Sequence, residues 1–199
     1  MDIPEDIEII ELLDKGLDNI TILGLDQALL VSGFGVIKNG EVIDSGTHRN
    51  TSKTTSFRMC SRRSLVLDAL KELVKKHNPD LVVIEDNHFA RNIQTLDSLA
   101  GLRAVLENYL FKSDIPFIVM KPVEWRSRLK IQATGKDKKK ASIDKVKEIV
   151  GEQLPEDESE GILIAFGGLE VLKRIDKFGL DKIRKEMEKK PRRRKRKRK

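Results

Sequence analysis

The 199-residue chain has 39% apolar, 36% charged and 5% aromatic residues, a composition typical of one α/β domain that meets charged partners. No apolar run approaches the ~20 residues of a membrane-spanning helix, and the N-terminus is acidic where a secretory signal would be basic, so we expect a cytoplasmic protein with no membrane role. One cysteine, Cys60, excludes an intramolecular disulfide, and the three histidines show no zinc-ligand spacing, so any bound metal must be held by oxygen.

Residues 1–19 form an acidic N-terminal extension, with seven acids and one lysine. A short amphipathic helix is predicted there by apolar residues at helical spacing, namely Ile3, Ile7, Ile10, Leu13 and Leu17. We expect this helix to pack on another part of the molecule.

Three β-rich runs follow, at 20–26, 33–40 and 41–47. The pair Asn39-Gly40 between the second and third predicts a two-residue hairpin turn. A helix is then predicted over 61–77, and it ends at Asn78-Pro79. The run LVVIED (81–86) has the composition of a short buried strand.

A second long helix is predicted over 92–111, followed by a strand at 116–122, a helical turn in VEWRSRL and a basic loop leading into a helix over 134–151. After the Leu154-Pro155 break, a last main helix is predicted over 157–175, with Gly167-Gly168 weakening its middle. The order βββ-α-β-α-β-α-α predicts an α/β fold with a mixed five-stranded sheet flanked by helices.

Beyond 175 the chain becomes a charged helix and then a polybasic arm, so we divide it into 1–19, a core domain over 20–175, and 176–199. Residues 190–199 carry nine positive charges and no negative one, and without them the formal net charge of +7 becomes −2. Such a run is typical of an arm that contacts nucleic acid, although an import-like signal or a solubilising tail has the same composition. We expect Arg192, Arg193 and Arg194 to contact DNA.

Carboxylates stand where the predicted fold could bring them together. Asp26 ends the first strand, Glu85 ends the fourth, and Asp157 and Glu160 lie three residues apart on the last helix, hence on one face. Crowded carboxylates repel one another unless cations lie between them, and oxygen-only clusters suit Mg²⁺ or Mn²⁺. Two such ions can clamp a phosphodiester during attack by water. The set therefore favours phosphodiester hydrolysis.

Each of these acids alone has a simpler interpretation. An acid that follows an apolar strand is often only the first solvent-exposed residue after that strand. This simpler interpretation is available for both Asp26 and Glu85. Asp157 alone could be a helix N-terminal acid that interacts with the macrodipole, and Glu160 alone could be a surface residue. The interpretation depends on the four together.

The motifs around these acids resemble the RuvC family of Holliday-junction resolvases, which have a ribonuclease H-like fold. The run ILGLDQALLVSGFGVI (22–37) is similar to the family's Gly-hydrophobic-Asp strand and Gly-aromatic-Gly hairpin strand. LVVIEDNHFARN (81–92), TGKDKKKASI and DESEGILIA (157–165) resemble its later motifs. The resemblance covers about residues 20–175, and the two charged ends suggest a divergent or phage-type member, from a bacterium or a phage-infected cell.

The resemblance implies a structure-specific endonuclease that binds four-way or branched DNA as a homodimer and nicks opposing strands. It implies two Mg²⁺ ions per subunit, with Mn²⁺ as a substitute and no small-molecule cofactor. Their ligands would be Asp26, Glu85, Asp157 and Glu160, the last at a position where the family usually has aspartate. The helix over 92–111 would form the dimer surface, and two-fold symmetry in the protein would match that of the junction.

Further residues are expected at the DNA. The resemblance places Phe89 and Arg91 over the junction centre, where an aromatic ring could stack on bases, although Phe89 could instead belong to the core. Lys138 and Lys139 are expected to bind phosphate, and Lys140 stands nearest the family's catalytic lysine. The same three lysines could instead be a solvated charge run.

Two alternatives remain open at this point. One is another ribonuclease H-like nuclease, such as a transposase-like or RNA–DNA hybrid-cutting enzyme. The other is a junction-binding protein whose cleavage is weak or lost, which the glutamate at position 160 leaves open.

Overall fold

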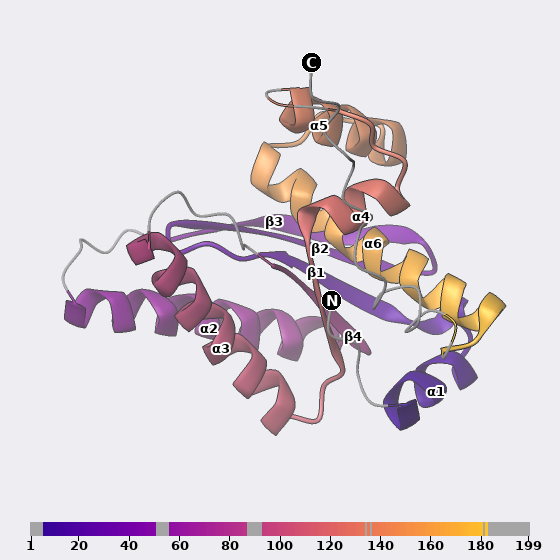
Figure 1. The fold of residues 1–199 in the computed structure, drawn as a ribbon, viewed down its shortest axis with the longest axis horizontal. Coiled ribbons are helices and arrows are strands. Elements are labelled where there is room, and N and C mark those ends of the chain that lie inside the picture. The colour runs from indigo at the N-terminus through magenta and orange to yellow at the C-terminus, as the bar shows by residue number, and fades with distance from the viewer. Residues whose placement is uncertain are drawn as a thin grey trace, which may run out of the picture.

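The computed structural model describes residues 6–50, 56–86, 93–133, 135, 137–180 and 182. A five-stranded sheet with the order β3-β2-β1-β4-β5 forms its centre (Figure 1). The antiparallel strands are β1 (Thr21–Asp26), β2 (Val31–Lys38) and β3 (Glu41–Arg49). The other two, β4 (Leu81–Glu85) and β5 (Phe117–Met120), run parallel to β1. The predicted mixed five-stranded sheet is confirmed.

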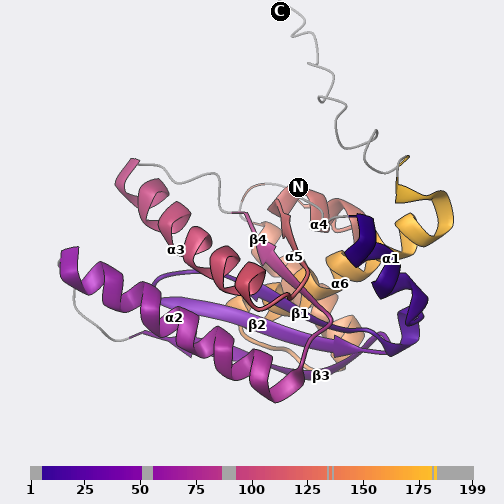
Figure 2. The same cartoon turned by 90° about the horizontal axis from the view of Figure 1, so that it is seen from below.

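Helices cover both faces of the sheet (Figures 1 and 2). On one face lie α2 (Ser56–His77) and α3 (Ile93–Lys112). On the other lie α1 (Asp6–Asp14), the 3₁₀ turn η1 (Leu17–Asn19), α4 (Pro122–Arg128), α5 (Asp137–Val150) and α6 (Glu156–Phe178). Strand alternation divides the core accordingly, since Ile22 packs with α6 whereas Leu23 and Leu25 pack with α2 and α3.

The β2–β3 hairpin turns at Asn39 and Gly40, as the sequence predicts. Both residues have positive φ, 56° and 75°, which a type I′ turn requires and which asparagine and glycine tolerate. Lys38 pairs with Glu41 on either side of the turn. The turn therefore fixes the register of the hairpin that carries the glycines discussed below.

Helix α6 runs unbroken through Gly167 and Gly168, so the predicted weak point does not interrupt it. A Cβ on Gly167 would lie 2.6 Å from Cβ of Trp125, and one on Gly168 would lie 2.4 Å from a methyl carbon of Val83. The two glycines let the helix approach the sheet and α4 closely. The packing gained offsets their low helix propensity.

The N-terminal segment packs against the same core as α6, as predicted. Leu13 and Leu17 of the predicted stripe contact this core, and Ile9 and Leu12 are buried in it, whereas Ile10 is 54% exposed. The prediction for Ile10 was wrong, because two helical faces of this segment are apolar and spacing alone does not choose between them. Lys15 then forms an ion pair of 2.7 Å with Asp80, just before β4.

Across the described ranges, none of the helices combines the length and the hydropathy of a membrane span.

Candidate metal centre and active site

Two central strands bring the first two carboxylates together. β1 and β4 are adjacent and parallel, with Leu25 opposite Ile84. The next residues, Asp26 and Glu85, therefore lie side by side where the two strands end. The buried Gln27 donates a 3.1 Å hydrogen bond from its amide nitrogen to the carbonyl oxygen of Glu85, which ties the two strand ends together.

Helix α6 brings the third carboxylate, and glycines on the strands make this approach geometrically feasible. A Cβ on Gly33 would lie 1.7 Å from the carbonyl oxygen of Asp157, and one on Gly24 would lie 2.3 Å from the backbone nitrogen of Ala165. The helix backbone thus lies directly on β1 and β2. This contact explains physically why glycines recur in the sequence run 22–37 and why α6 points Glu160 at the strand ends.

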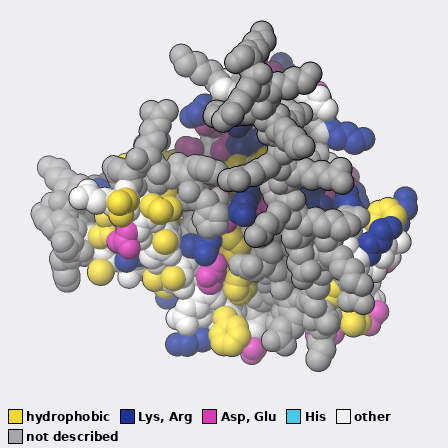
Figure 3. Space-filling view, in the orientation of Figure 1, with side chains coloured by type: hydrophobic (Ala, Val, Ile, Leu, Met, Phe, Trp, Pro, Cys, Tyr) yellow, Lys and Arg dark blue, Asp and Glu magenta, His cyan; other side chains and the backbone are white. Residues whose placement is uncertain are grey.

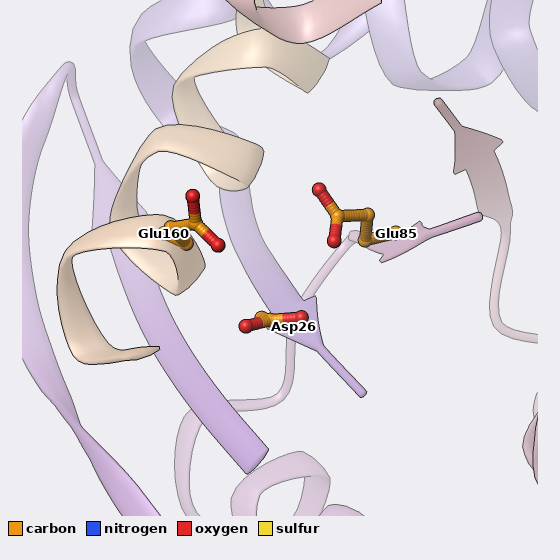
Figure 4. A group of neighbouring side chains, drawn as sticks. All are labelled: Asp26, Glu85 and Glu160. Carbon is orange, nitrogen blue, oxygen red and sulfur yellow. The ribbon is translucent and has the colours of Figure 1, made fainter. Parts of the chain in front are cut away.

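Asp26, Glu85 and Glu160 converge from β1, β4 and α6 (Figure 4). One carboxylate oxygen from each lies within 4.8 Å of the other two. Glu85 is 4% exposed, Glu160 is 9% exposed and Asp26 is half-buried. We call these three residues the carboxylate triad.

Burial and mutual repulsion disfavour the charged form of the triad. The pKa of Asp26 is raised well above its ordinary value by burial and then by the charges of Glu85, Glu160 and Asp157. Burial and the charge of Glu160 raise the pKa of Glu85 to about 7, despite the opposing effects of a Trp125 hydrogen bond and of Arg126. Burial also raises the pKa of Glu160, against the attraction of Arg126. A cation between the three would remove this repulsion.

The donor set fits a hard divalent cation. It consists of carboxylate oxygens alone, in a partly buried site whose charges repel one another, and Mg²⁺ and Mn²⁺ prefer oxygen ligands of this kind. Asp26, Glu85 and Glu160 would hold such an ion.

Asp157 lies next to the triad without joining it. Its charge contributes to the raised pKa of Asp26, but the group of converging oxygens among the described residues does not include it. Two other acids of this helix turn away from the triad, since Glu156 pairs with Lys139 at 2.6 Å and Glu158 accepts a 2.7 Å hydrogen bond from Ser45. Of the four predicted ligands, the structure brings three together and leaves Asp157 beside them.

Trp125 positions Glu85. Its indole Nε1 donates a 2.8 Å hydrogen bond to Oε1 of Glu85, and its side chain is fully buried where α4 packs against α6. Because one carboxylate oxygen accepts this bond, the orientation of the Glu85 carboxylate beside Asp26 and Glu160 is fixed. Hydrogen bonds of this kind hold metal-binding carboxylates in place.

Arg126 brings a positive charge into the site. Its guanidinium forms an ion pair with Glu160 and lies 4.2 Å from the ring centre of Trp125. The stacking on Trp125 holds the guanidinium beside the carboxylates. A planar, permanently charged group at this position can also bind a phosphate oxygen.

The sequence motifs do not single out Trp125 or Arg126. The available signal was weak: the chain has a single tryptophan, and an arginine follows it on a short helix. Their contacts with Glu85 and Glu160 depend on how α4 packs against the sheet and α6, which the spacing of residues along the chain does not reveal.

The three predicted lysines begin α5 and are exposed, but they differ in surroundings. Lys139 pairs with Glu156, and its pKa is raised by that glutamate, with smaller contributions from Glu160 and Asp157. Lys138 lines a cavity beside Arg126. Lys139 thus has the clearest electrostatic link to the carboxylates, and a catalytic role for Lys140 stays a prediction.

Behind the triad, an ion-pair chain attaches β4 to α3. Arg103 contacts Asp86 at 2.7 Å and Glu107 at 3.0 Å. Asp86 directly follows Glu85, so this chain fixes the backbone at the end of the strand. The remaining predicted DNA contacts, Phe89, Arg91, Arg192, Arg193 and Arg194, lie outside the described residues.

A mixed sheet with this strand order and helices on both faces defines a ribonuclease H-like fold, and here carboxylates lie at the ends of its central strands and on the closing helix. Solved structures agree with the fold. T. thermophilus RuvC in complex with a Holliday junction substrate superposes with a TM-score of 0.65 at 14% identity, covering 81% of this chain and 98% of that one. The yeast mitochondrial Holliday junction resolvase Ydc2 gives 0.57 at 16% identity, covering 90% and 89%.

The sequence comparisons give the family. The profile described as "Crossover junction endodeoxyribonuclease RuvC" matches residues 22–167. The protein of that name from Carboxydothermus hydrogenoformans is 28% identical over 154 residues, covering 74% of this chain and 94% of the relative. The one from Protochlamydia amoebophila is 26% identical over 155 residues, covering 74% and 89%. This chain belongs to the RuvC family, as the sequence motifs predict.

Proposed function

We propose that this protein is a metal-dependent endonuclease that resolves four-way DNA junctions by hydrolysing phosphodiester bonds. The observation that carries the proposal is the convergence of Asp26, Glu85 and Glu160, with oxygens within 4.8 Å of one another. Membership of a family described as crossover junction endodeoxyribonucleases supports the choice of reaction and substrate.

The triad would hold Mg²⁺, or Mn²⁺ as a substitute, with two ions per subunit. Bound there, the metal would activate water and stabilise charge on the attacking and leaving oxygens. Asp157, which lies beside the triad, would supply the further carboxylate that a second ion needs.

Other side chains of the site would orient the reactants and neutralise charge. Trp125 keeps Glu85 turned toward the other carboxylates through its 2.8 Å hydrogen bond. Arg126 lies against Glu160 and can contact a phosphate oxygen of the cleaved strand, where a guanidinium binds well. Lys139 or Lys140 would add positive charge from the start of α5.

We expect the protein to act as a homodimer through the N-terminal half of α3. Ile93 is 84% exposed and Leu96 is 39% exposed on this helix. Figure 3 shows hydrophobic side chains gathered over that end of the molecule, at the left of the view. Burying them against a second copy would be favourable, and a two-fold axis would place two active sites symmetrically on a junction.

DNA contacts outside the site would come from Phe89, Arg91, Lys138 and the arm that contains Arg192, Arg193 and Arg194. Phosphate contacts made by cations supply most of the affinity and carry little sequence information. The arm should therefore strengthen binding to DNA of every shape.

The test is cleavage of synthetic four-way, three-way and linear DNA by purified protein in Mg²⁺ or Mn²⁺. The proposal expects paired nicks at symmetric positions of opposing strands on the four-way junction, and much slower cleavage of the linear duplex. Cleavage of linear DNA or RNA–DNA hybrids at the same rate would favour another ribonuclease H-like nuclease. Tight junction binding without cleavage in either metal would identify a binding protein instead.

A further inference from the structure

A cavity of about 550 Å³ opens beside the carboxylate triad, between α4 and the segment that follows it. This volume falls within the range of ~300–1,000 Å³ typical of small-molecule sites. Two lining residues connect the cavity with the triad, since Arg126 pairs with Glu160 and Asp86 directly follows Glu85. A group bound in the cavity would therefore lie next to the reacting phosphate.

The lining has two chemical parts. Four cationic side chains take part, from Lys121, Arg126, Lys130 and Lys138. The acid in the lining, Asp86, is paired with Arg103 at 2.7 Å, and Arg126 is paired with Glu160, so the charge that favours an anion comes from the three lysines. Apolar side chains complete the wall, from Val123, Ile131 and Ala133, and Val123 is 69% exposed. A ligand that suits both parts carries negative charge and a weakly polar group.

The turn after α4 forms one wall of the cavity, and it has a lysine, Lys130, at a position where glycine is usual. Beyond α4, the backbone amide of Lys130 donates a 3.2 Å hydrogen bond to the carbonyl oxygen of Ser127. The backbone amide of Ile131 donates one of 2.8 Å to the carbonyl oxygen of Arg126. This pattern is a Schellman C-cap, which reverses the chain over α4. Lys130 has φ of 58°, in the left-handed region that glycine or asparagine adopts more readily. A residue held in such a conformation beside a site is a candidate for a functional role.

We propose that this cavity is a nucleotide subsite that takes one unpaired nucleotide of the cleaved strand, adjoining the scissile phosphate. The lysines bind its phosphate, and Val123, Ile131 and Ala133 contact its base. The inference rests on the proposed function and extends it, because the subsite would help to select the nucleotide at which the strand is cut.

The occupant is unpaired because a base in a stacked duplex cannot enter a cavity of this kind. Extruding a base costs least where it is already unstacked. Bases at the centre of an open junction lack a stacking neighbour on one side, so they leave the stack at lower cost than bases inside a continuous duplex. The cavity would in this way couple cleavage to the branched form of the DNA.

The test uses full-length protein and four-way junctions that carry 2-aminopurine at single positions around the cleavage site. Divalent ions are chelated so that the DNA stays intact. Fluorescence of 2-aminopurine rises when the base leaves the stack, and we expect a rise of at least about threefold at one position on protein binding. Lys130→Asn, which removes the charge but tolerates the left-handed turn, should reduce that rise. Lys147→Asn, on an exposed part of α5, is the matched control and should not.

A filled cavity gives a second test. Ala133→Phe should abolish the fluorescence rise, keep the melting temperature, and slow cleavage of the normal junction about tenfold. An abasic nucleotide at the responsive position should restore its rate to within about twofold of wild type, because the cavity then has nothing to accept. This rescue distinguishes a filled subsite from a damaged fold.

Three results would overturn the inference. The first is a junction that is bound and cut with no fluorescence rise at any position. The second is normal cleavage by a folded Ala133→Phe variant. The third is that free dTMP binds in the cavity, as detected by NMR, while no 2-aminopurine position responds. That result would indicate a site for free nucleotides. A protein that neither binds nor cuts junctions would remove the proposed function and this inference together.

Discussion

The indole nitrogen of Trp125 donates a 2.8 Å hydrogen bond to the carboxylate of Glu85. This bond links a fully buried side chain of α4 to the carboxylate at the end of β4. It lowers the pKa of Glu85 against the larger effect of burial, so it favours the charged form that binds a cation. Trp125 is therefore a positioning residue for the proposed metal centre.

Trp125→Phe should weaken metal binding about ten- to hundredfold, the usual effect of losing such a hydrogen bond. The pKa of Glu85 should rise further, so the acid limb of the pH–rate profile should move to higher pH. Junction affinity should change little. Leu172→Val, which removes volume from the same core away from the site, should lower stability without moving the profile. An unmoved profile in Trp125→Phe would show that the hydrogen bond has no role in the reaction.

The stability of the metal-free protein should fall as the pH rises from about 4.5 to 7. Glu85 has a folded-state pKa of about 7 against an ordinary value of 4.5, so the folded state binds its proton more tightly than the unfolded state does. The associated stability is complete below pH 4.5 and is lost as the pH rises through 7. The loss is roughly 3 kcal/mol for this group alone.

The measurement is urea unfolding in EDTA at several pH values, with Glu85→Gln as the comparison. Glutamine keeps an oxygen for Trp125 but does not titrate, so the variant should show a flatter dependence in this window, with the remainder due to Asp26 and Glu160. Added Mg²⁺ should restore wild-type stability at pH 7. If the free energy of unfolding depends on pH in the same way in both proteins, burial and the neighbouring carboxylates do not raise the pKa of Glu85.

The fold and most of the site could be predicted from the sequence because local patterns determine them. Alternating apolar residues and Asn39-Gly40 predict the hairpin, and strand-end positions predict Asp26 and Glu85. Glu160 follows from its place on the last helix. The involvement of Trp125 and Arg126 could not be predicted, because it depends on α4 packing against α6 and β4. Asp157 shares a helical face with Glu160 but lies beside the triad, which spacing alone cannot resolve.

Gly33→Ala should destabilise the protein by about 1–3 kcal/mol, because the new methyl group would lie 1.7 Å from the carbonyl oxygen of Asp157. Backbone cannot move aside as a side chain can, so α6 must shift and carry Glu160 with it. The cleavage rate should fall by more than the loss of folded protein alone would cause. Gly46→Ala is the matched control, since its methyl would meet only the ring of Phe34, at 3.0 Å. Equal thermal unfolding curves for the two variants would show that α6 does not depend on Gly33.

Glu160 should make the enzyme more active in Mn²⁺ than in Mg²⁺. Its side chain is one methylene longer than the aspartate usual in the family, and Mg²⁺ demands near-ideal octahedral geometry. Glu160→Gln should reduce cleavage at least about a hundredfold, whereas Glu160→Asp should retain activity and narrow the Mn²⁺ advantage. Rates on a four-way junction in each metal provide the measurement.

The control for Glu160 is Glu158→Gln. Glu158 lies on the same helix but bonds to Ser45 on β3, away from the triad. Its substitution should leave cleavage within about twofold of wild type. If Glu160→Gln and Glu158→Gln cut equally well in both metals, Glu160 is not a metal ligand.

The most direct test of the account compares wild type and Asp26→Asn on one four-way junction, with the protein in excess and Mg²⁺ present. Asparagine keeps the size of the side chain and removes the charge at the centre of the triad. Single-turnover cleavage should fall at least about a hundredfold, while the Kd for the junction stays within about twofold, because affinity comes from cations elsewhere. Cleavage by Asp26→Asn at the wild-type rate would contradict the assignment of the triad as the active site.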